Sequence, residues 1–97
     1  MEITIPKTFK LLGHTYRVKQ LKRVTGGENY ALHDFDKKVI YLTKLADDFS
    51  KDQQEEYLLH EQVHAILDNL GYNELSNNEQ FVEQVSRALH QILKTSK

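Results

Sequence analysis

The chain has 97 residues, of which 39% are hydrophobic and 28% charged, and this is enough for a single domain with one modest core over residues 1–97. The net charge of −1 argues against nucleic acid or anionic membrane as partners, and the absence of cysteine excludes disulfides, thiolate zinc sites and cysteine nucleophiles. No apolar run approaches the length of a membrane span and the start lacks a signal-peptide pattern, so we expect a cytoplasmic protein.

The first part of the chain has the residue pattern of paired strands. Residues 8–12 and 15–21 are rich in Thr, Tyr, Val and Leu, and they flank Gly13-His14. This arrangement predicts a tight turn between two antiparallel strands. Gly26-Gly27 then marks the next break in the chain.

A second hairpin is predicted after this break. Residues 29–33 and 38–42 are strand-like, and the acidic stretch 34–37 between them is typical of a turn. Together the two hairpins predict a small antiparallel sheet of three or four strands.

The next segment has the pattern of a long amphipathic helix. Ser50 followed three residues later by Gln53 is a capping box, and Gly71 is a C-terminal stop after Leu70. The expected apolar stripe consists of Leu58, Leu59, Val63, Ile66, Leu67 and Leu70. The sequence therefore predicts a helix that packs one face on the sheet.

A second helix follows this one. Ser76 and Glu79 repeat the capping pattern and predict its start. Its expected apolar stripe consists of Phe81, Val82, Val85, Ala88, Leu89, Ile92 and Leu93. A sheet followed by two packed helices is an α+β domain.

The first helix contains the pattern H-E-x-x-H. Two histidines at i and i+4, here His60 and His64, leave one helix face about 6 Å apart, so both imidazoles can bind one metal ion. Glu61 is offset around the helix toward solvent, where it can take a proton from a metal-activated water. The pattern predicts a zinc site with Glu61 as general base; the alternative is two solvent-facing histidines on an amphipathic helix.

A catalytic zinc usually has three protein ligands and a water. The metzincin pattern is excluded, because Leu67 and Leu70 stand where it needs glycine and a third histidine. The next helix offers Glu79 and Glu83. A strict antiparallel pairing of the helices would place Glu83 level with His64, whereas helical periodicity puts Glu79 on the flank of the apolar stripe. We take Glu79 as the third ligand and Glu83 as the alternative, and a site without a glutamate ligand stays open. Glu79 has a second interpretation as a helix cap only.

The remaining polar residues give weaker signals. Asp68 follows His64 by four residues and is a candidate acceptor for the second imidazole proton of that histidine. His14, His33 and His90 are isolated in the sequence, and we expect them to be surface or partly buried residues and not ligands.

These residues resemble those of small prophage-type zinc metallopeptidases related to the ImmA/IrrE group. The likeness covers about the last forty-five residues, through the segments 58–67 and 78–82, and the hairpins match more loosely. The Asn-Glu pair at 78 and 79 is similar to the glutamate-ligand motif of thermolysin-like enzymes. The resemblance implies a minimal zincin-like fold, His60 and His64 as zinc ligands, Glu61 as base and Glu79 as third ligand. The chain departs from the group in lacking an Ala-rich continuation after this glutamate.

Two functions are compatible with these patterns. The first is a zinc-dependent metallopeptidase that hydrolyses a peptide or protein substrate, held in extended form along an exposed edge strand. The second is a non-catalytic zinc-binding phage or prophage protein that acts as a partner-binding module. The short chain favours the second, because few residues are left to build walls for a substrate.

Overall fold

A computed structural model describes residues 5–22, 30–44 and 50–96. The predicted break at Gly26-Gly27 and the predicted first residue of the second hairpin, Asn29, lie outside these ranges. The described elements form an α+β arrangement of four strands followed by helices, as the sequence predicts. Among the described residues, no helix is long and apolar enough to span a lipid bilayer.

The four strands form one mixed sheet in the order β1-β2-β4-β3. The strands are β1 (Thr8–Leu11), β2 (His14–Leu21), β3 (Ala31–Asp34) and β4 (Val39–Thr43). Both predicted hairpins are present as antiparallel pairs, but β2 and β4 pair in parallel, so the prediction of a fully antiparallel sheet is wrong. The physical reason is that each hairpin places its second strand at the centre, and these two strands run in the same direction.

The first turn and the central strand show how local sequence sets this sheet. Leu12 and Gly13 both have positive φ, 48° and 83°, which is the two-residue turn that matches the twist of a hairpin. The turn therefore lies one residue earlier than predicted, and His14 is the first residue of β2. The β4 sequence Val-Ile-Tyr-Leu-Thr is almost continuously apolar, which suits a strand with neighbours on both sides.

The long helix α1 (Lys51–Leu70) begins and ends where the sequence predicts. Ser50 and Gln53 form a reciprocal capping box, and Gly71 adopts the left-handed conformation with φ 84°. A short helix, α2 (Asn73–Ser76), then precedes α3 (Glu79–Thr95).

The predicted cap of the last helix is wrong. Asn78, not Ser76, is the N-cap of α3, and its side chain accepts a hydrogen bond from the main-chain N–H of Phe81. Asn is as good an N-cap as Ser, and the extra turn of α2 moves the helix start by two residues. Ser76 is buried in α2 and performs a different task, described below.

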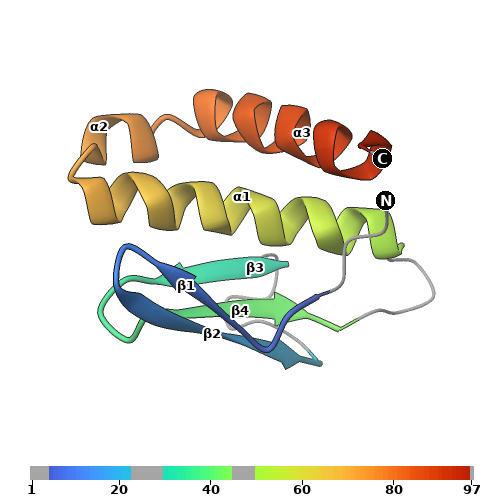
Figure 1. The fold of residues 1–97 in the computed structure, drawn as a ribbon, viewed down its shortest axis with the longest axis horizontal. Helices are drawn as coiled ribbons and strands as arrows, with labels where there is room; N and C mark the ends of the chain where they lie inside the picture. The colour runs from blue at the N-terminus through green and yellow to red at the C-terminus, as the bar shows by residue number, and fades with distance from the viewer. Residues whose placement is uncertain (1–4, 23–29, 45–49, 97) are drawn as a thin grey trace.

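The helix α1 lies between the sheet and α3, so it packs on both sides (Figure 1). One core cluster joins α1 to the sheet through Tyr16, Val18, Ile40, Leu42, Leu58 and Ala65. A second, smaller cluster joins α1 to α3 through Val63, Leu67 and Val82. Part of each predicted stripe lies outside these cores, because Ile66, Leu70, Ala88 and Ile92 are exposed.

Candidate metal centre

The two histidines of the H-E-x-x-H pattern lie side by side on α1. Their ring centroids are 4.9 Å apart, as expected for residues one helical turn apart. The side chains of His60 and His64 are 17% and 14% exposed. They therefore lie at the boundary between core and solvent, where packing holds the rings and one side stays open.

The carboxylate of Glu79, on the last helix, lies beside both histidines. As the first residue of α3, it places one carboxylate oxygen 3.1 Å from Nε2 of His60 and the other 3.1 Å from Nε2 of His64. One donor atom from each of the three residues lies within 4.8 Å of the others. Two imidazole nitrogens and a carboxylate that face one point are a donor set that suits Zn²⁺ with an open fourth position.

Glu83 lies on the other side of His60. Its carboxylate is 3.9 Å from Nδ1 of that ring, and it forms a 2.9 Å ion pair with Arg87. In the structure, therefore, the carboxylate of Glu79, and not that of Glu83, faces the two Nε2 atoms. Helical periodicity agrees with this arrangement. A strict antiparallel pairing of the two helices, which would have favoured Glu83, does not occur, because α2 intervenes between them.

Glu61 is not placed toward solvent as predicted. It is partly buried and lines the same cavity as the two histidines. Burial, followed by repulsion from the Glu79 carboxylate, raises the pKa of Glu61 from 4.5 to about 7, while a main-chain hydrogen bond from His33 opposes this rise. The prediction that Glu61 faces solvent is wrong because β3 covers this flank of α1. A helical wheel shows the faces of one helix but not the elements packed against it. A carboxylate with a pKa near neutrality is suited to general-base chemistry.

Nδ1 of His64, the ring nitrogen that does not face Glu79, has a different partner from the expected Asp68. Nδ1 of His64 lies 3.0 Å from the hydroxyl of Ser76, whereas Asp68 is hydrogen-bonded to His33. The interpretation of Asp68 as the partner of His64 is therefore wrong. Burial lowers the pKa of His64, which favours the neutral ring that a metal needs.

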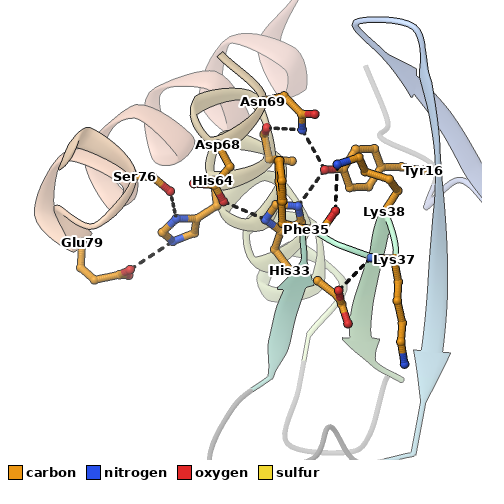
Figure 2. A network of polar contacts seen from close by, with 12 residues as sticks. Tyr16, His33, Phe35, Lys37, Lys38, His64, Asp68, Asn69, Ser76 and Glu79 are labelled. Carbon is orange, nitrogen blue, oxygen red and sulfur yellow. Dashed lines mark hydrogen bonds and ion pairs between the residues drawn. The ribbon is translucent and has the colours of Figure 1, made fainter. Parts of the chain in front are cut away.

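A partly buried polar network joins α1 to the sheet beside this site, as Figure 2 shows. Asn69 donates a 2.8 Å hydrogen bond to the hydroxyl of Tyr16, and that hydroxyl lies 2.8 Å from Nε2 of His33. Since the phenol donates its one proton to His33, the Nδ1–H of His33 donates to Asp68 at 3.1 Å. Burial lowers the pKa of His33 and raises that of Tyr16, so both groups stay neutral.

His33 is the residue of this region that the sequence did not single out. It lines the cavity with the two ligand candidates, although its own ring nitrogens are both engaged by Tyr16 and Asp68. In the sequence Asp68 is a candidate partner only of His64, so its spacing gives no signal for His33. Only the position of β3 beside α1 could show that Asp68 pairs with His33.

The cavity around the site has a volume of about 540 Å³ and lies between α1, α3 and β3. Its lining includes residues of these three elements and of α2, among them His33, His60, Ser76 and Ser86. Its size is within the range of small-ligand sites. The metal-binding candidates therefore lie in a concave surface that has room for a water and part of a substrate.

A second group of possible metal ligands exists among the described residues. Asp52, Glu55 and His90 bring their donor atoms close together at the other end of the α1–α3 interface. The ammonium of Lys94 lies 3.3 Å from Asp52 and 3.2 Å from Glu55. This group therefore already contains a cation from the chain itself, and we interpret it as an ion-pair network.

Comparison of the chain with protein-family models, curated proteins and solved structures gave no match.

Proposed function

We propose that this protein is a zinc-dependent metallopeptidase, related to the ImmA/IrrE group, that hydrolyses a peptide or protein substrate. One observation carries the proposal: the carboxylate of Glu79 lies 3.1 Å from Nε2 of both His60 and His64. An H-E-x-x-H pattern alone offers two donors, and a nearby carboxylate from another helix supports a third, which is the number of protein ligands usual for catalytic zinc.

His60, His64 and Glu79 would hold the ion in this proposal. A bound Zn²⁺ polarises a carbonyl group and lowers the pKa of water. Glu61 would then accept the proton of the attacking water and return it to the amine that leaves. Its position in the same cavity as the two histidines supports this role.

The cytoplasm is the location we propose for this activity. Support comes from the absence of cysteine in the chain, which fits a reducing compartment. We propose neither nucleic acid nor membrane as a partner, since the net charge of −1 provides no excess of positive charge.

The proposal is tested by measuring zinc content and proteolysis on the same samples. The wild type should bind about one Zn²⁺ per chain and cleave members of a broad peptide panel, and chelation should stop cleavage. His60→Ala should lose the metal. Glu61→Gln should keep the metal and lose cleavage by a factor on the order of 10²–10⁴.

The same experiment separates the alternative function. If the wild type binds zinc stoichiometrically but cleaves nothing in broad peptide and protein panels, the non-catalytic partner-binding module replaces the peptidase. If the wild type binds no zinc, or if His60→Ala retains it, both functions are wrong.

A further inference from the structure

The short helix α2 contains one buried residue. Ser76 is 4% exposed, whereas the residues on both sides of it, 72–75 and 77–78, are all exposed. A serine is an unusual residue to bury alone, because its hydroxyl loses its contact with water. Its burial therefore needs a polar partner, and that partner is His64.

The contacts of His64 account for both of its ring nitrogens. Nδ1 lies 3.0 Å from the Ser76 hydroxyl and Nε2 lies 3.1 Å from the Glu79 carboxylate (Figure 2). An ionised carboxylate only accepts hydrogen bonds, so Nε2 of His64 carries the proton in this arrangement. Nδ1 of a neutral ring is then an acceptor, and the Ser76 hydroxyl donates to it.

Metal binding requires the opposite tautomer. For Nε2 to bind an ion through its lone pair, the proton must be on Nδ1. A serine hydroxyl can donate or accept, so the same Ser76 contact is satisfied in both tautomers. His33 shows the contrast: Asp68 can only accept, and it holds the proton of His33 on Nδ1.

We propose that Ser76 is a positioning residue that orients His64 and stays hydrogen-bonded to Nδ1 in both tautomers. Nε2 then exchanges its contact with the Glu79 carboxylate for a bond to the metal ion, while Nδ1 keeps its hydrogen bond. This inference rests on the metal site of the proposed function. The tautomer change itself moves one proton from Nε2 to Nδ1 through solvent and releases none.

The chain offers a matched control for this role. Ser86 is also a buried serine, at 3% exposure, and it lines the same cavity, but its hydroxyl donates to the main-chain carbonyl of Glu83. Ser86→Ala therefore removes a buried hydroxyl from the cavity without touching His64.

The test measures zinc affinity by competition with a chromophoric chelator, together with the imidazole ¹⁵N shifts of His64 with and without Zn²⁺. Ser76→Ala should lower zinc affinity roughly 10- to 100-fold, the range expected for loss of a group that orients a ligand. Ser76→Thr, which keeps the hydroxyl, should stay close to wild type, and so should Ser86→Ala. In the wild type the ¹⁵N shifts should report a proton on Nε2 without zinc and on Nδ1 with zinc.

Several outcomes would overturn the inference. One is a folded Ser76→Ala protein with wild-type affinity; another is a His64 that has the same tautomer with and without zinc. If Ser76→Ala does not fold, Ser76→Thr and Ser76→Val differ only in hydroxyl against methyl, and equal affinities for them reject the inference. If the wild type binds zinc and Ser76→Ala binds it with the same affinity, only this inference is wrong. If the wild type binds no zinc, the proposed metal site is wrong as well.

Discussion

Replacing Glu61 by Gln should stabilise the metal-free protein at neutral and alkaline pH. The side chain is partly buried, and burial together with the Glu79 carboxylate raises the pKa of Glu61 to about 7. Gln is almost the same size and carries no charge. The substitution therefore removes the cost of holding a carboxylate in this place while it leaves the packing nearly unchanged.

The size of the effect follows from the shift. The pKa of Glu61 rises from 4.5 to about 7, and at about 1.4 kcal/mol per pH unit this lowers the free energy of unfolding by at most about 3–4 kcal/mol. Because the folded-state pKa lies above the unfolded one, the contribution of Glu61 is fully present below pH 4.5. It is lost as the pH rises through about 7.

The histidines of the site act with the opposite sign. Burial lowers the pKa of His33 and His64 below 6.5, so their contribution to stability grows as the pH rises toward that value. Both histidines are present in the wild type and in Glu61→Gln. The difference between the two proteins therefore reports on Glu61.

Urea unfolding of chelator-treated wild type and Glu61→Gln between pH 4.5 and 8.5 measures this difference. The two unfolding free energies should be similar at the acidic end, and the variant should become more stable by up to about 3–4 kcal/mol at the alkaline end. A difference that is independent of pH, or a wild type that gains on the variant as the pH rises, would refute the reasoning.

Three further predictions concern the ligands, the polar network and the helix end. Glu79→Gln should weaken zinc binding by more than about 10-fold in chelator competition, whereas Glu83→Gln should change it little; the reverse order would reassign the third ligand. Tyr16→Phe should lower the unfolding free energy by about 1–3 kcal/mol, because His33 loses its hydrogen-bond donor in a buried place, and an unchanged thermal midpoint would contradict the network. Gly71→Ala should cost about 1 kcal/mol in urea unfolding, because φ is 84° there although no atom would clash; a neutral effect would argue against the left-handed cap.

The parts of the fold that depend on neighbouring residues could be predicted from the sequence. The capping box at Ser50, the stop at Gly71 and the two hairpins are each specified within a few residues. The parallel pairing of β2 with β4 is not, because it depends on which edges of two hairpins meet. Asn78 and Ser76 are both good caps, and only the packing of α2 selects Asn78.

The same distinction applies to the site. The spacing of His60 and His64 on one helix predicted their proximity, and helical periodicity pointed to Glu79. The burial of Glu61 and the pairing of His33 with Asp68 depend on β3 lying against α1. A helical wheel describes one helix and cannot show which strand covers it.

Anomalous diffraction at the zinc edge, on crystals of the zinc-loaded protein, tests the central claim most directly. We predict one strong peak, with Nε2 of His60, Nε2 of His64 and a carboxylate oxygen of Glu79 each at about 2.0–2.2 Å from the ion. The contradicting result is the absence of a peak between these three residues, or a single peak at the group formed by Asp52, Glu55 and His90.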